Sequence, residues 1–169
     1  VSMYHEFTVG GLIGTIFGTQ VHNCSSSVEI DIKQQVAQSN ASKIQPGVGG
    51  CIGAIIEFTR TDSSKVLSNV SHLSNTGDIK IANGSYNGTT DYVNLSVGGV
   101  IGITFKSNRT CTVEYLDNSG DITFDATFSK YDTRIGGVIG FMYGLNVSHC
   151  TNSGNITINS GAFYYLYCG

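Results

Sequence analysis

Apolar and polar positions recur along the chain in one fixed pattern, in which a glycine-rich apolar block is followed by a longer alternating block. The glycine block reads Val-Gly-Gly-x-Ile-Gly from residues 9, 48 and 97, and Ile-Gly-Gly-Val-Ile-Gly from residue 135. The fourth copy of the second block, residues 147–158, reads Val-Ser-His-Cys-Thr-Asn-Ser-Gly-Asn-Ile-Thr-Ile. The glycine blocks start 39, 49 and 38 residues apart. Such a period is typical of architectures in which each repeat is one structural unit.

Each repeat predicts three short strands. In the fourth repeat one strand starts at the glycine block, a second covers residues 147–150, and the alternating segment 155–158 is the third. Residues 152–154 predict a tight turn whose glycine can adopt positive φ. Only the arcs between blocks change length, as stacked strands with outward loops allow. The sequence therefore predicts an all-β fold, a parallel β-solenoid (β-helix) of about four turns with three short strands per turn and variable outward arcs.

Stacked turns require matching residues at equivalent positions, and the repeats supply them. One column, at the turn, is polar. It holds Ser26, Asn75, Asn118 and Asn152, which can build a ladder of side-chain amides. An antiparallel sandwich, the alternative, does not require this register. The four predicted apolar columns are Val21, Val70, Val113 and Val147; Ile30, Ile79, Ile122 and Ile156; Ile32, Ile81, Phe124 and Ile158; and Ile13, Ile52, Ile101 and Ile139.

We expect one solenoid domain over residues 1–169, with turns beginning near residues 7, 47, 96 and 134 and a partial fifth turn over 162–169. The sequence has no signal peptide and does not start with methionine, which is typical of a processed or partial chain. A segment of a longer repeat chain is one form that such a chain can take.

The repeat blocks resemble the GLUG-type repeats of bacterial and protist surface proteins, in which Val-Gly-Gly-Leu-Ile-Gly is followed by Asn-Cys-x-Asn-Ser-Gly-x-Ile. The resemblance covers four repeats and nearly the whole chain. The chain departs from the pattern at residues 26–28, where the first turn lacks its glycine, and at residues 164–169, where the last block is degenerate. The resemblance implies an adhesin-like or other cell-surface protein, and it is specific for architecture rather than for an activity.

Composition and motifs exclude several function classes. Charged residues make up 12% of the chain and the net charge is −3, so no basic surface is predicted for nucleic acid. No apolar run approaches the roughly 18 residues of a membrane span. The sequence has no Cys-x-x-Cys, His-Glu-x-x-His or phosphate loop, and no helix or acidic partner follows the Gly-Gly blocks as in dinucleotide sites. We expect neither an enzyme nor a bound cofactor.

Nine Asn-x-Ser/Thr motifs predict a secreted protein that carries N-linked glycans. Thirteen asparagines and 35 serines or threonines in 169 residues predict about 2.7 such motifs by chance. The abundance of asparagine, serine and threonine in turns is the alternative explanation for part of the excess. We expect an extracellular or cell-surface location. The candidate glycosylation sites are Asn23, Asn40, Asn69, Asn83, Asn87, Asn94, Asn108, Asn146 and Asn155.

Five cysteines leave at least one thiol unpaired if every disulfide is internal. Cys24 and Cys150 share a column three turns apart, roughly 14 Å, which exceeds the roughly 7 Å limit for a disulfide. They are therefore interpreted as buried apolar residues, and Cys51 and Cys168 also fall in strand-like positions. A Cys111–Cys150 bridge is the alternative to free thiols.

Two columns carry side chains that could bind a ligand or metal. Glu29, Asp78 and Asp121 stack in register, and bound calcium could relieve their mutual repulsion. The alternative is an exposed column screened by water and salt. Paired carboxylates also serve glycoside hydrolysis, but no basic and aromatic cluster accompanies them here. His72 and His149 share a column, are expected to face outward, and are too far apart to share a metal.

Two segments predict packing surfaces. Strict alternation through the glycine block places Leu12, Cys51, Val100 and Val138 on a stripe that faces away from the core. We expect another layer on this stripe, either the arcs 33–47 and 82–96 or another protomer. The closing segment 162–168 is apolar and aromatic, and we expect further repeats or the next subunit to cover it. Its candidate contact residues are Phe163, Tyr164, Tyr165 and Tyr167.

These features favour a structural extracellular N-glycosylated repeat protein that forms or decorates a surface filament or coat. The expected partner is another copy, stacked head to tail at the solenoid ends. The alternative is an adhesin-type binding module that recognises a host or surface glycan through the variable arcs. Those arcs carry Tyr86, Tyr92 and Tyr131.

Overall fold

The protein is described here as a computed structural model. The described residues are 8–34, 46–56, 58–59, 65–66, 68–83, 95–104, 111–125, 128–143, 145–159 and 163–169. Within these ranges all regular structure is β-strand. None of the described segments forms a helix long and apolar enough to cross a membrane.

The first two turns each contribute four strands to the solenoid. Between β6 and β9 the second turn also carries a small antiparallel hairpin of β7 (Phe58–Thr59) and β8 (Lys65–Val66). The first turn consists of β1 (Thr8–Gly10), β2 (Ile13–Phe17), β3 (Gln20–Ser26) and β4 (Ile30–Gln34). The second consists of β5 (Gly47–Gly49), β6 (Ile52–Ile56), β9 (Asn69–Asn75) and β10 (Ile79–Asn83).

The later turns repeat this arrangement. β19 (Phe163–Cys168) then lies on β15, at the place where a fifth turn begins. The third turn consists of β11 (Ser96–Gly98), β12 (Ile101–Thr104), β13 (Cys111–Asn118) and β14 (Ile122–Asp125). The fourth consists of β15 (Phe128–Gly136), β16 (Ile139–Phe141), β17 (Leu145–Asn152) and β18 (Ile156–Ile158).

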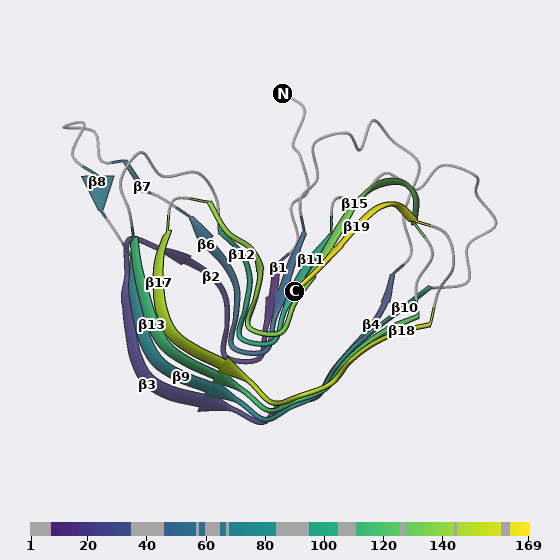
Figure 1. The fold of residues 1–169 in the computed structure, drawn as a ribbon. Coiled ribbons are helices and arrows are strands. Elements are labelled where there is room, and N and C mark those ends of the chain that lie inside the picture. The colour runs from purple at the N-terminus through teal and green to yellow at the C-terminus, as the bar shows by residue number, and fades with distance from the viewer. Residues whose placement is uncertain are drawn as a thin grey trace.

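Equivalent strands of successive turns pair in parallel and form four stacked sheets (Figure 1). The first sheet has the order β1-β5-β11-β15-β19 and the second β2-β6-β12-β16. The third has the order β3-β9-β13-β17 and the fourth β4-β10-β14-β18. The predicted parallel β-solenoid is confirmed. The predicted columns also pair in register, for example Val113 with Val70 and Val147, and Ile122 with Ile79 and Ile156.

The glycine block makes two strands rather than one, so a complete turn has four strands instead of the three expected. Figure 1 shows the first and second sheets meeting as a V inside the outer curve of the third and fourth sheets. The point of the V, the glycine apex, lies against the turn column. A Cβ atom on Gly50 or Gly99 would overlap the side chain of Asn75 or Asn118, respectively. The apex therefore requires glycine because a side chain would prevent this contact.

The V divides the interior into two cores. One core lies between the first and fourth sheets and includes Val97, Ile79 and Phe124. The other lies between the second and third sheets and includes Ile101, Val70 and Leu116. Both consist of apolar columns that run along the solenoid axis, so every middle turn is buried by the turns on either side of it.

Two sequence-based expectations about glycines and alternation are wrong. Cys51 and Val100 are fully buried in the second core with Val138 packed against them, so the Leu12, Cys51, Val100 and Val138 column does not face away from the core. The reversal at the apex interrupts the strict alternation from which that stripe was inferred. Gly154 also does not adopt positive φ. It is glycine because a Cβ would overlap the backbone of Gly120 in the preceding turn.

Candidate functional site

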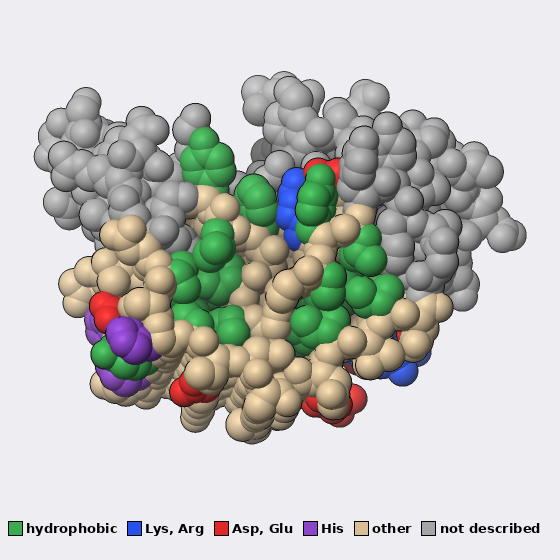
Figure 2. Space-filling view, viewed as in Figure 1, with side chains coloured by type: hydrophobic (Ala, Val, Ile, Leu, Met, Phe, Trp, Pro, Cys, Tyr) green, Lys and Arg blue, Asp and Glu red, His purple; other side chains and the backbone are tan. Residues whose placement is uncertain are grey.

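The outward surface of the fourth turn, here called the open end, is the most distinctive surface of the described molecule. Among the described strands, β16, β17 and β18 are the edge strands of their sheets at this end, and the first sheet alone continues beyond them, with β19. Figure 2 shows hydrophobic side chains gathered in two groups on this face. The two groups correspond to the two cores. The open end is therefore a cross-section of the solenoid interior that faces solvent.

Three hollows cover the open end, and column residues of the last turn line all of them. One, of about 370 Å³, is bordered by Val138, Val147, Cys150 and Asn152. A second, of about 300 Å³, lies between Ile139 and Cys168. A third, of about 460 Å³, lies beside Tyr167. Residues of one further turn would occupy these positions if the columns continued.

The exposed fraction of equivalent valine side chains differs between the two ends of one column. Val147 in the last turn is 38% exposed, whereas Val113 in the third turn is 0% exposed. Val21, at the same position in the first turn, is only 7% exposed. In this column the last turn is therefore more exposed than the first, whereas in the Leu12 column the first-turn residue Leu12 is 41% exposed and the last-turn residue Val138 is half-buried.

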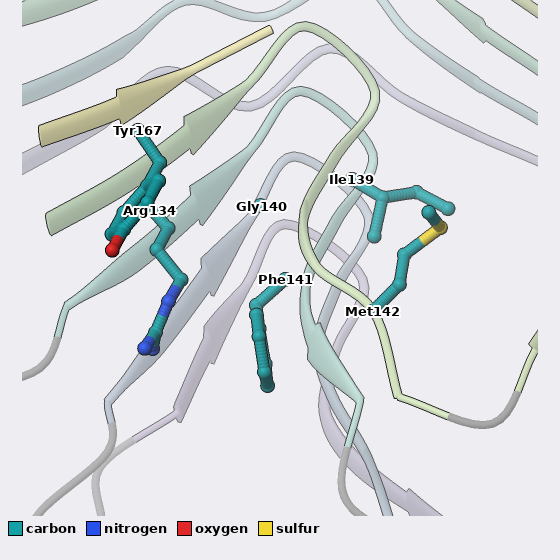
Figure 3. A pocket seen from close by; sticks show the side chains of 6 residues that line it. All are labelled: Arg134, Ile139, Gly140, Phe141, Met142 and Tyr167. Atoms are coloured by element: carbon teal, nitrogen blue, oxygen red, sulfur yellow. The ribbon is translucent and has the colours of Figure 1, made fainter. Parts of the chain in front are cut away.

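The 460 Å³ hollow lies in the mouth of the V (Figure 3). The Arg134 guanidinium donates a hydrogen bond to Asp132 Oδ2 at 2.8 Å and lies 4.3 Å from the centre of the Phe141 ring. Tyr167, in β19, pairs with Arg134 and is 54% exposed. Met142 closes the hollow on the side opposite Tyr167. This hollow combines a cation already paired with a carboxylate and two aromatic rings, so it suits an apolar side chain better than a free anion.

The turn column forms the predicted amide ladder, which is confirmed. Asn75 Nδ2 donates to Asn118 Oδ1 at 2.9 Å, and Asn118 Nδ2 donates to Asn152 Oδ1 at 2.8 Å. Each amide also donates to the carbonyl of the glycine two residues later, at 2.8–2.9 Å. Asn152, the last member, is exposed at the open end. A polar ladder that spans the turns in this way fixes their register as well as stabilising them.

A second ladder consists of rings on the outer surface of the third sheet. The His72 and Tyr115 rings stack at 4.6 Å, and the Tyr115 and His149 rings stack at 4.6 Å. The expected outward orientation of the two histidines agrees with their exposure. The residues of this column, Asn23 included, all have left-handed backbones with φ of 54–56°. Sequence reasoning missed this corner because no glycine marks it.

The acidic column is engaged in backbone hydrogen bonds. Asp78 Oδ1 accepts from the Asp121 N–H at 2.9 Å, and Asp121 Oδ1 accepts from the Asn155 N–H at 2.7 Å. The carboxylates of Asp78 and Asp121 thus each bind the next turn. Within the described residues no three His, Cys, Asp or Glu side chains gather as a metal site. Calcium binding by Glu29, Asp78 and Asp121 stays a prediction.

The thiols of Cys24, Cys51, Cys150 and Cys168 are free, and the side chain of Cys111 lies outside the described residues. The register pairs Cys111 with Leu145, which is five positions from Cys150 along β17, or roughly 16 Å. The alternative Cys111–Cys150 bridge is therefore wrong. Desolvation raises the pKa of the Cys150 thiol and raises that of Cys51 to about 11, so both are protonated thiols at neutral pH.

The candidate glycosylation sites divide into two sets. Asn23, Asn69, Asn146 and Asn155 are exposed on strands or turns of the described solenoid. Asn83 lies in β10, but its side chain falls outside the described residues, as do Asn40, Asn87, Asn94 and Asn108 entirely. Phe163, Tyr164 and Tyr165 lie in β19, and their side chains are likewise outside the described set. So are those of Tyr86, Tyr92 and Tyr131.

The fold and its columns define a repeat protein of the parallel β-solenoid class. The family model of the GLUG motif matches residues 5–32, which include most of the first turn. The resemblance inferred from the repeat blocks is thereby confirmed for this motif. No curated protein is significantly similar to the chain, and no solved structure is either.

Proposed function

We propose that this chain is a structural, extracellular, N-glycosylated repeat protein that forms or decorates a surface filament or coat by end-to-end stacking of solenoids. The observation that carries the proposal is the open end. Three edge strands and two apolar cores meet solvent there, and an exposed strand edge is a template for pairing with another chain. Contacts between unlike ends that stack along one axis do not close into a ring, so they generate linear assemblies.

A charge placed in the open end tests the stacking. Val147→Asp puts a carboxylate into the hollow bordered by Cys150 and Asn152, where a stacked turn would bury it without a partner. Thr76→Asp is the matched control, because Thr76 is exposed in the turn between β9 and β10, away from the open end and outside every Asn-x-Ser/Thr motif. Sedimentation velocity and negative-stain electron microscopy should find linear particles for the unchanged chain and the control, and monomers for Val147→Asp. A chain that stays monomeric at every concentration contradicts the proposal.

The extracellular, glycosylated part of the proposal has its own test. Enzymatic removal of N-glycans converts each occupied asparagine to aspartate, and peptide mass mapping locates the change. We expect occupancy at exposed positions such as Asn23, Asn69 and Asn146. Native material with no converted asparagine would eliminate the secreted glycoprotein from consideration.

A second candidate function, an adhesin-type binding module, is supported by the ring ladder. Left-handed backbone is costly for histidine and tyrosine, and strained residues of this kind concentrate at functional sites. Glycine adopts this backbone without strain, and the chain contains 22 glycines, yet three of these four positions hold histidine or tyrosine. Binding to immobilised glycans that is lost in Tyr115→Ala, and kept in Thr76→Ala, would support it. Equal binding by both variants, or none by the unchanged chain, would contradict it.

A further inference from the structure

Cys24 and Cys150 occupy one column at opposite ends of the solenoid. Cys24 pairs with Leu73, and Cys150 pairs with Leu116, so two leucines separate the cysteines within one molecule. Both thiols are free and half-buried, and Cys150 borders the 370 Å³ hollow of the open end. A first turn from another copy, stacked on the fourth turn, would bring a cysteine of each end to neighbouring positions.

The strand β19 restricts how such a turn can arrive. It lies on β15, and its Cys168 pairs with Ile135, the residue equivalent to Val97 and, through Val48, to Val9. The Gly137 N–H donates to the Gly169 carbonyl at 2.9 Å, as the Gly99 N–H does to Gly136 at 3.2 Å. Cys168 and Gly169 thus hold the positions that Val9 and Gly10 hold in the first turn. A rigidly docked copy would bring its β1 to a place that β19 already fills.

Of the two competing strands, β1 is the one that can be displaced. It has three residues, all of them partly exposed, and it pairs only with β5 at the edge of the first sheet. β19 has six residues. If β19 of one copy replaces β1 of a second copy, the parallel pairing on β5 of the second copy is conserved. Strands β2, β3 and β4 of the second copy can then lie on β16, β17 and β18 of the first.

We propose, resting on the end-to-end function above, that copies join by strand replacement and are cross-linked by a disulfide between Cys150 and Cys24 of the second copy. β19 of one copy takes the place of β1 in the next, whose β2–β4 complete the turn that β19 begins. In-register residues of adjacent parallel strands lie roughly 4.8 Å apart, within the range of about 4.4–6.8 Å between the Cα atoms of a disulfide. The other columns continue through the joint, with Val147 against Val21, Asn152 against Ser26 and Ile156 against Ile30.

Thiol–disulfide exchange supplies a balanced route to the cross-link, with a low-molecular-weight disulfide such as oxidised glutathione as the oxidant. The Cys150 thiolate attacks the glutathione disulfide and releases one reduced glutathione. Cys24 of the second copy then loses its proton, attacks the mixed disulfide and releases the second glutathione. Burial raises the pKa of the Cys150 thiol, so the reaction should accelerate as the pH rises above neutrality.

Mixing two single-cysteine variants tests the joint directly. Both chains carry Cys51→Val, Cys111→Ser and Cys168→Val, because valine matches the columns of residues 51 and 168. One also carries Cys24→Ser and the other Cys150→Ser. Oxidised glutathione is added at pH 8.5, and products are separated by non-reducing electrophoresis. We expect a dimer band from the mixture and no dimer band from either chain alone. Peptide mapping of the dimer should find residue 24 disulfide-linked to residue 150. Equal dimer from one chain alone overturns the proposal.

A second variant tests the strand replacement without relying on cysteine. Val9→Pro weakens β1, because proline has no backbone N–H to donate to the strand pairing and because its ring fixes the φ angle. If β1 must leave, this variant should assemble at least as readily as the unchanged chain, with circular dichroism confirming that the solenoid is intact. Loss of assembly in folded Val9→Pro overturns the replacement. Linear particles without the 24–150 cross-link overturn the joint but leave end-to-end stacking in place, whereas monomers throughout overturn both.

Discussion

Asn118 makes hydrogen bonds to both neighbouring turns, and this makes it the central residue of the amide ladder. It accepts from Asn75, donates to Asn152 and donates to the Gly120 carbonyl. Asn118→Ala should lower the free energy of unfolding by about 2–4 kcal/mol, because it leaves polar groups without partners in a dry interior. Urea unfolding followed by circular dichroism measures the change.

Asn152→Ala is the control for the ladder prediction. Asn152 is exposed at the end of the ladder, so water can replace the lost bond, and the cost should stay near 1 kcal/mol or less. Equal losses in the two variants would mean that the ladder does not stabilise the turns cooperatively.

Cys51 gives the protein a pH-dependent stability at alkaline pH. Its pKa is raised to about 11 in the fold by burial, from 9.0 for an unburied thiol. The folded state therefore retains a proton that the unfolded state releases, so the contribution is complete below pH 9 and disappears as the pH rises toward 11. The loss is on the order of 2 kcal/mol. Cys51→Val, which copies the neighbouring Val100, should remove this part of the pH profile in urea titrations.

At the scale of the strand, the glycine apex has no room for a side chain. A Cβ on Gly99 would overlap the Gly137 carbonyl oxygen and the Asn118 side chain. Gly99→Ala should therefore destabilise the solenoid by about 3 kcal/mol. Gly14→Ala is the matched control, because its Cβ would lie 3.4 Å from the nearest atom, Thr8 O, an ordinary contact. It should be neutral or stabilising by up to about 1 kcal/mol. Similar thermal midpoints for the two variants would refute the apex contact.

The left-handed corner of the third sheet can be tested by comparing two substitutions at one position. Tyr115→Ala and Tyr115→Gly both remove the stacked ring, but only glycine accepts φ of 56° without strain. Tyr115→Gly should be the more stable by about 1 kcal/mol. At Thr157, in an ordinary strand, the order should reverse, with alanine the more stable. The same order at both positions would contradict a strained corner.

Sequence predicted the elements that repeat and missed those that interrupt the repetition. The apolar columns and the Asn75–Asn118–Asn152 ladder were predictable because identical residues recur at one spacing. The second strand of each glycine block was not predictable. The apolar pattern does not show that the chain reverses within the block, so the alternation of inward and outward positions was extended through the reversal. The ring ladder was seen only as two histidines, because Tyr115 is chemically unlike them and no glycine signals the positive φ. The different exposure of Val21 and Val147, which are equivalent residues of the first and last turns, depends on packing against neighbouring turns and is not encoded in any single repeat.

At the scale of the whole molecule, stability should vary from turn to turn because each turn is buried mainly by its neighbours. Val70, Val113 and Leu116, in the second and third turns, are almost completely buried, whereas Val147 in the fourth is 38% exposed. Local opening should therefore cost least at the open end, and β17 and β18 should exchange their amide hydrogens faster than β9 and β13 in the monomer.

Assembly should change this exchange pattern at one end in a defined way. Strands β16, β17 and β18 gain pairing partners in the stacked state, so their amides should become protected, while β9 and β13 change little because they are already paired on both sides. In the strand-replacement joint, β1 loses its partner and residues 8–10 should exchange faster in the assembly than in the monomer. Hydrogen–deuterium exchange with mass spectrometry, on Val147→Asp monomers and on assembled unchanged chain, measures both changes. Protection of β16–β18 together with retained protection of β1 would indicate rigid stacking on an intact first turn, which contradicts replacement and requires β19 to move instead.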